Sequence, residues 1–367
     1  MRRMSVSSIV SLATLAVAVL WWFVPESYPY GAASEVSVGF NHWVEREAGT
    51  ALLAASGVLG LLVAPAQRSR PRLAAVGAAV QGAFFLLVMC DASVLASLGY
   101  AMIPAVVAGV VALVAIGVLR RRPVAYGAAL VLVGGVVLAL TLTDALPHYV
   151  AGLATGFGRF AERIAWSWAM AIAAVTWAWL AYRGLAQPEE AANPRWGRTV
   201  TILAALGGVP YAVARLSWAT PWPLGGFDPR TGHVELLAQP GGDPATRLQG
   251  FMIGMSAVLA VVLTLGLISR WGEVFPRWVP RVGGRPVPVL LAVVPGAFAA
   301  LALCVSAPGV LATAVQLGSW LDGVLFVLLF PCPVWGPLLG AAVLAYWRRR
   351  TTAVSVAVGA GQTSARR

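Results

Sequence analysis

Ten apolar runs dominate the chain, and each is long enough to cross a bilayer as a helix. They lie near residues 5–24, 48–65, 73–90, 101–119, 123–142, 164–182, 199–217, 248–269, 287–305 and 321–347. A transmembrane helix needs about 20 predominantly apolar residues. Charge enters the runs only at their ends, as Arg215 in the seventh and Asp322 in the tenth. A surface helix of a soluble protein would instead alternate apolar and polar faces. The pattern predicts an all-α, polytopic transmembrane helix bundle.

Arginines between the runs orient this bundle. Cytoplasmic loops carry an excess of basic residues, and 20 of the 26 arginines flank alternate runs on one side. The rule predicts that both termini are cytoplasmic, with residues 1–350 forming one helix-bundle domain. The first run is longer than the apolar region of a signal peptide, so we expect it to be retained as a span. Residues 351–367 are small and polar, which predicts a disordered cytoplasmic tail.

The amino-acid composition argues against several classes of function. Hydrophobic residues make up 59% of the chain and charged residues 11%, against about 25% charged residues in soluble domains. The net charge of +12 could indicate nucleic acid binding, but the arginines form short clusters between apolar runs rather than a basic stripe. The chain has no lysine, which excludes a phosphate-binding loop of the Walker type and a Schiff-base lysine. Neither the three cysteines nor the histidines show a metal-binding spacing, so we expect no cofactor and no metal.

The last run has a proline-rich centre. Pro331, Cys332, Pro333 and Pro337 fall within seven residues. Each proline removes a backbone donor and clashes with the preceding turn, so a regular helix cannot pass through unbroken. Broken helices line the substrate sites of many transporters. These four residues are therefore a candidate cavity, and a packed kink is the alternative.

All three histidines lie on the predicted outer side, close to carboxylates. They form a candidate outer-rim polar site with these neighbours: His42 with Glu45, His148 with Asp144, and His233 with Glu235. We expect His42 and Glu45 to share one face of an interfacial helix, three residues apart. Metal binding or proton transfer is the functional interpretation, and solvated loop residues are the alternative.

The centres of the spans lack the acids and histidines that ion-coupled pumps use. Asp91, Asp144, Glu162 and Asp322 all map to the ends of spans, and Gln81 and Arg215 are the strongly polar residues within them. Arg215 can extend toward the outer interface. This distribution argues against proton-coupled transport and leaves apolar or lipid-like cargo open.

The segment RWGEVFPRWVPRVGGRPVP, residues 270–288, interleaves arginines with aromatic residues and prolines. We expect it to lie on the cytoplasmic membrane surface, with Arg270, Arg277, Arg281 and Arg285 contacting anionic lipid headgroups. It resembles the W-G-E-x-x-P-R-W-x-P loop of uncharacterised multi-pass membrane proteins of high-GC, actinobacterial-type bacteria. The resemblance covers this loop and the spans around it, about a third of the chain. It implies a place in a bacterial cytoplasmic membrane and no particular activity.

Three function classes remain. The one that the broken last span favours is a permease-like or accessory protein for a small apolar or lipidic molecule. A membrane-embedded enzyme with an outer-rim site of histidines and carboxylates is the second class. A membrane scaffold without cargo is the third. The absence of a soluble domain favours a protein that is not an enzyme.

Overall fold

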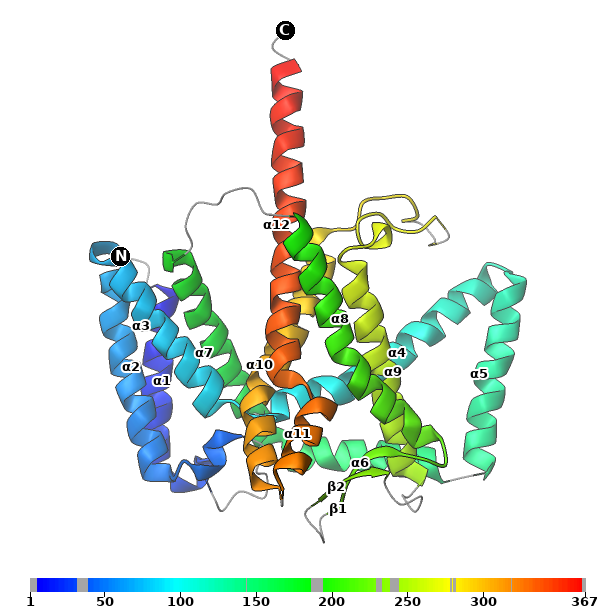
Figure 1. Cartoon of the computed structure of the whole chain (residues 1–367), viewed down its shortest axis with the longest axis horizontal. Coiled ribbons are helices and arrows are strands. Elements are labelled where there is room, and N and C mark those ends of the chain that lie inside the picture. The colour runs from blue at the N-terminus through cyan, green and yellow to red at the C-terminus, as the bar shows by residue number, and fades with distance from the viewer. Residues whose placement is uncertain are drawn as a thin grey trace.

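The computed structural model describes residues 5–31, 39–142, 144–185, 194–228, 233–237, 244–277, 279, 282–317 and 319–364. The chain forms a polytopic helix bundle (Figure 1). Nine helices in these residues are long and apolar enough to cross a membrane, when the two halves of the last span are counted together, and α5 is a tenth, shorter apolar helix.

The helices follow the predicted runs. In chain order they are α1 (Val6–Phe23), α2 (Arg46–Ser69), α3 (Pro71–Phe84) with the π-helical turn η3 (Phe85–Met89), α4 (Ser93–Leu119), α5 (Pro123–Leu142), α7 (Ala161–Leu185), α8 (Pro194–Leu216), α9 (Pro244–Gly266), α10 (Val289–Gln316), and α11 (Trp320–Leu329) with α12 (Cys332–Ser364). The expected all-α, multi-pass architecture is confirmed, and a short β-hairpin is added to it.

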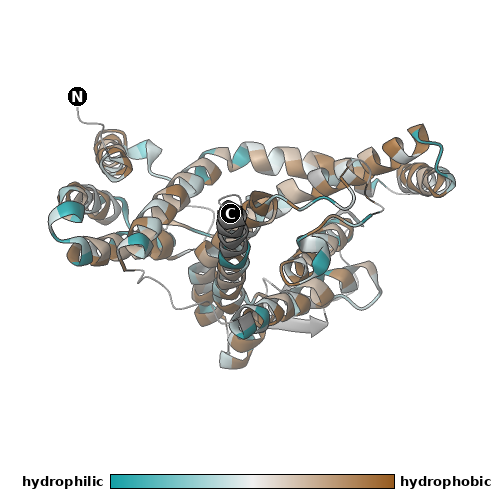
Figure 2. Ribbon diagram, turned by 90° about the horizontal axis from the view of Figure 1, so that it is seen from above, coloured by the Kyte–Doolittle hydropathy of each residue, from teal (hydrophilic) through white to brown (hydrophobic). Residues whose placement is uncertain are grey.

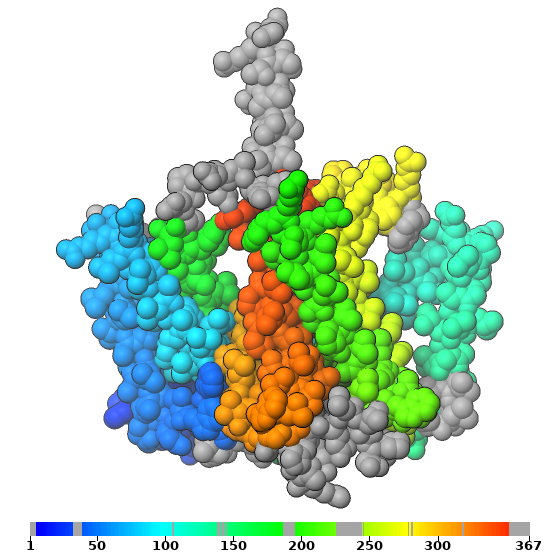
Figure 3. Space-filling model, in the orientation of Figure 1, coloured from blue at the N-terminus to red at the C-terminus, as the bar shows by residue number. Residues whose placement is uncertain are grey.

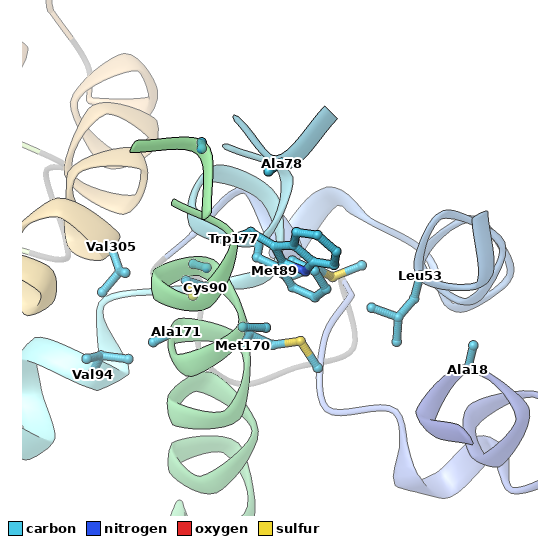
Figure 4. Packing of buried hydrophobic residues seen from close by; sticks show 14 of the residues in the cluster. Ala18, Leu53, Ala78, Met89, Cys90, Val94, Met170, Ala171, Trp177 and Val305 are labelled. Carbon is cyan, nitrogen blue, oxygen red and sulfur yellow. The ribbon is translucent and has the colours of Figure 1, made fainter. Parts of the chain in front are cut away.

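Two groups of helices pack side by side. In the first group, α1 packs on α2 and α3 packs on α7, and Figure 4 shows Trp177 of α7 lying beside Met89, with Met170 and Leu53 around them. The second group contains α8, α9, α10 and α12. Helices α4 and α10 contact both groups. The buried core therefore has two parts, one in each group of helices, and α4 lies between them.

Helix α5 stands apart from the bundle. It packs against its chain neighbours α4 and α6, and the space-filling view shows a gap between α5, at the right, and α9 (Figure 3). Hydrophobic residues predominate along most helices (Figure 2), and many large apolar side chains are exposed. In a membrane, lipid chains would cover these exposed apolar side chains, so they need no protein partner.

The connecting segments sort to two ends of the bundle. The α2–α3 turn, the α4–α5 turn, the described part of the loop between α9 and α10, and the projecting part of α12 lie at the upper end in Figure 1. Helix α6 and the β-hairpin lie at the lower end, here called the hairpin end. The predicted alternation of arginine-rich and arginine-poor loops matches this arrangement. The assignment of the upper end to the cytoplasm stays a prediction.

Three elements were not expected from the apolar pattern. Helix α6 (Ala145–Arg159) runs across the hairpin end, and strands β1 (Leu224–Asp228) and β2 (His233–Leu237) pair antiparallel, with Gly226 opposite Glu235. Residues 351–364, expected to be disordered, continue α12 in the structure. Two facts favour this continuation. No proline follows Pro337 to interrupt the helix, and lengthening an existing helix does not require a new, unfavourable nucleation step.

Candidate functional site

The last span is broken at Phe330 and Pro331. Helix α11 ends at Leu329, Phe330 leaves the helical conformation at φ −119° and ψ 71°, and α12 begins at Cys332. The backbone N–H of Trp335 donates to the carbonyl of Pro331 at 2.7 Å and starts the new helix. Pro333 lies in the first turn of α12, where a missing N–H costs little, and Pro337 lies inside that helix. The predicted break is confirmed, and Pro331 marks it.

An apolar cavity of about 330 Å³ adjoins this break. Its walls come from α4, α8, α9, α10, α11 and α12, and Pro331 and Cys332 line it. Pro333 and Pro337 are not among its lining residues. The volume is at the lower end of the range of ligand pockets, about 300–1,000 Å³, and therefore suits one small or single-chain molecule.

Arg215 is the charged residue in the wall of the apolar cavity. Its guanidinium carbon lies 4.6 Å from the ring centroid of Trp218, 5.4 Å from that of Tyr211 and 5.6 Å from that of Phe330. It forms no hydrogen bond or ion pair with any residue that the structure describes. The three rings hold the guanidinium plane in place and leave its N–H groups without acceptors in that part of the chain.

A second, more polar cavity of about 530 Å³ lies between α4, α6, α7 and α9. Ala92, Ala96 and Tyr100 of α4 line both cavities. The Tyr100 hydroxyl accepts a hydrogen bond of 2.9 Å from Gln249. The two cavities are therefore neighbours across one helix, one able to hold an apolar group and the other able to hold water.

Tyr149 of α6 also lines the polar cavity. It is 9% exposed, and its hydroxyl has no hydrogen-bond partner among the described residues. Burial and the neighbouring Tyr100 raise the pKa of Tyr149, so its hydroxyl stays protonated.

The three histidines lie on three separate elements, η2, α6 and β2. His42 lies in the short helix η2 (Phe40–Trp43) and Glu45 is the N-cap of α2, so the expectation that they share one interfacial helix was wrong. An extended residue, Val44, separates the two elements. His148 lines the polar cavity, and its Nδ1 lies 2.7 Å from the carbonyl oxygen of Asp144.

His233 and Glu235 lie in β2, and their side chains fall outside the described part of the structure. No group of three or more His, Cys, Asp or Glu side chains that could hold a metal ion occurs among the described residues. The hypothesis of an outer-rim site therefore gains no geometric support.

A buried charge cluster was missed at the sequence level. Asp91 follows η3 and is completely buried, and its Oδ2 accepts hydrogen bonds from Arg163 Nε at 3.0 Å and Asn41 Nδ2 at 3.2 Å. Its Oδ1 accepts from the Ser167 hydroxyl at 3.0 Å and the Ser93 N–H at 2.8 Å. Each carboxylate oxygen is therefore saturated, which marks a structural cluster rather than an open binding site.

The same cluster anchors the loop between α1 and α2. Arg163 Nη1 donates to the carbonyl of Pro29 at 3.0 Å, and its guanidinium carbon lies 5.6 Å from the ring centroid of Tyr30. Asp91 maps to the end of a span and Arg163 to a loop, so hydropathy alone classes both as solvated. Their juxtaposition could be found only from the packing of α3 against α7.

The 267–288 loop is docked on α12. The Tyr346 hydroxyl donates to the Gly272 carbonyl at 2.8 Å, and Arg349 pairs with Glu273 at 3.1 Å. A side chain at position 272 would overlap the carbonyl of Gly266 at the end of α9, so the close contact of the loop with that helix end requires glycine. Arg270, Arg277 and Arg285 are exposed, whereas Arg281 lies outside the described residues. The loop thus has a protein-facing part and an exposed arginine-rich part.

Comparison of this chain with protein-family models, with curated proteins and with solved structures finds no match.

Proposed function

We propose that this chain is a permease-like or accessory protein of a bacterial cytoplasmic membrane that holds a small apolar or lipidic molecule. The observation that carries the proposal is the apolar cavity at the break between α11 and α12. Pro331 lies eleven residues after Trp320, the first residue of the span, or roughly 17 Å along it at 1.5 Å per residue. That is about half of a 30 Å hydrocarbon core, where an apolar cargo would reside.

The bacterial cytoplasmic membrane and its anionic lipids belong to the same proposal. Support for the location comes from the W-G-E-x-x-P-R-W-x-P pattern of residues 271–280. Exposed Arg270, Arg277 and Arg285 support lipid contact, because arginine pairs well with phosphate. A scaffold would not need a cavity, and no group of three or more His, Cys, Asp or Glu side chains among the described residues supports the enzyme alternative.

Labelling of Cys332 tests the cavity. Cys332 is 3% exposed and lines the cavity wall, so a small, membrane-permeant reagent should reach it through the cavity. We expect N-ethylmaleimide to modify Cys332 slowly in phosphatidylcholine nanodiscs, and decanol, a test ligand for the cavity, to slow the reaction further. Peptide mass spectrometry would identify the modified cysteine and separate it from Cys90 and Cys304.

Two glycines of α4 provide a matched pair of variants. Gly99 lines the cavity and Gly109 does not, and a Cβ added at either meets no atom within 4 Å. Gly99→Leu should fill the cavity and suppress Cys332 modification at least fivefold, whereas Gly109→Leu should leave it unchanged. If Cys332 is inert in the folded protein but reacts after denaturation, the cavity is closed and the proposal fails.

A further inference from the structure

Several hydrogen-bond donors line the apolar cavity without an acceptor among the described residues, including the Trp335 indole N–H, Arg215 and Tyr100. Arg215 has its guanidinium among three aromatic rings and no acceptor among the described residues. Tyr100 uses its hydroxyl oxygen to accept from Gln249, and its O–H proton has no acceptor in the same part of the chain. A cation beside an apolar space is unfavourable unless a counter-charge approaches it.

The surroundings of Arg215 favour an anion from outside the chain. No carboxylate of the described residues pairs with it. The aromatic rings hold the flat guanidinium in a fixed orientation, which reduces the entropy lost when it binds a phosphate or carboxylate through two parallel hydrogen bonds. Tyr100 adds a neutral donor from a different helix.

The shape of the space determines the rest of the ligand. Apart from Arg215 and a few hydroxyl groups, the wall of the 330 Å³ cavity is apolar. One alkyl chain fits this lining and volume, whereas the neighbouring cavity that shares Tyr100 has polar side chains such as Ser97 and Gln249 that suit a charged headgroup. A ligand with a single apolar tail in the apolar cavity and an anionic headgroup facing the polar cavity would thus match both spaces.

We propose that the cavity binds a single-chain amphiphile with a phosphate or carboxylate headgroup, and that Arg215, assisted by Tyr100, recognises the headgroup. This inference rests on the proposed function, because it requires the same cavity to accept a ligand. It adds the chemical class of that ligand and the residues that select it.

Protection of Cys332 from N-ethylmaleimide tests the inference. Decyl phosphate, decanol and inorganic phosphate are compared in phosphatidylcholine nanodiscs, and the half-protecting concentration of each is measured. We expect decyl phosphate to protect at a concentration at least about tenfold below that of decanol, because hydrogen bonds to charged groups contribute more than neutral ones. Inorganic phosphate at the same concentrations should give no protection.

Variants separate the head from the tail. Arg215→Gln should raise the half-protecting concentration of decyl phosphate about tenfold or more and leave that of decanol unchanged, which also shows that the variant is folded. Tyr100→Phe should have a smaller effect in the same direction. Arg122→Gln, at the opposite end of the bundle, is the matched control and should change neither value.

The outcomes distinguish the two proposals. If decanol and decyl phosphate protect equally and Arg215→Gln changes neither, headgroup recognition is refuted and the cavity proposal stands. If inorganic phosphate protects as well as decyl phosphate, the ligand is a free anion and the amphiphile is refuted. If neither decyl compound protects Cys332, both proposals fail together.

Discussion

Arg163 and Arg215 are the same side chain in opposite surroundings. Arg163 is 5% exposed and directs its N–H groups to Asp91, Asn41 and the carbonyl of Pro29. Arg215 is half-buried among rings and meets no acceptor in the described chain. A charge whose acceptors all belong to the fold stabilises the fold, whereas a charge whose donors remain available can recognise a ligand. This difference separates the structural cluster from the candidate site.

The buried cluster makes a prediction about stability. Asp91→Asn removes the counter-charge of a buried guanidinium, which typically costs about 3–5 kcal/mol. We expect a clearly lower midpoint of unfolding in guanidinium chloride for the detergent-solubilised protein, followed by circular dichroism. Glu47→Gln is the control, because its ion pair with Arg46 is exposed and should contribute little. Equal midpoints for the two variants would contradict the structural role of Asp91.

Helical elements were predictable wherever length and hydropathy alone determine them. The ten runs match α1 to α5 and α7 to α12 with shifts of up to five residues, with three exceptions. Helix α4 begins eight residues earlier than expected, α10 ends eleven later, and α12 continues seventeen residues beyond the predicted end of the last run. Helix α6 was missed because it lies across the end of the bundle and carries both polar and apolar residues. The break near Pro331 was predictable, since the effect of proline on a helix is local.

The candidate site was only partly predictable for the same reason. Arg215 stood out in the sequence as a charge within an apolar run, and Pro331 and Cys332 as the break. Tyr100, Tyr211 and Trp218 resemble any other interfacial aromatic residues until α4 and α8 are brought together. Asp91 and Arg163 are 72 residues apart, and no local pattern relates them.

The arginine-rich loop gives a prediction at the scale of one element. Replacing Arg277, Arg281 and Arg285 together by glutamine should weaken association with anionic lipid, by about 1 kcal/mol for each arginine near a charged surface. Native mass spectrometry at low salt would measure retained phosphatidylglycerol, with phosphatidylcholine as the neutral control. Retention of phosphatidylglycerol equal to that of the unmodified chain would indicate that docking on α12, through Tyr346 and Arg349, is the main role of the loop.

The whole molecule has a predicted sidedness that reporter fusions can test. Arginine-rich turns gather at one end of the bundle, and basic loops favour the cytoplasm. Fusions after residues 70, 121, 190, 278 and 360 should therefore report a cytoplasmic location. Those near residues 35, 96, 153, 232 and 312 should report the outside, so that the two locations alternate along the chain. Two consecutive fusions on the same side would contradict the ten-span topology.

The cluster around Asp91 also constrains how the chain is made. Its partner Arg163 follows 72 residues later, so at about 5–20 residues per second the carboxylate waits roughly 4–14 s before that partner is synthesised. During this time α3 ends in an uncompensated charge, which opposes its stable insertion by about 2.5–3.5 kcal/mol if the charge is drawn to the centre of the bilayer. We therefore expect α3 to reach its stable position only after α7 has been synthesised and Arg163 can pair with Asp91. Until then the membrane insertion machinery would have to hold α3.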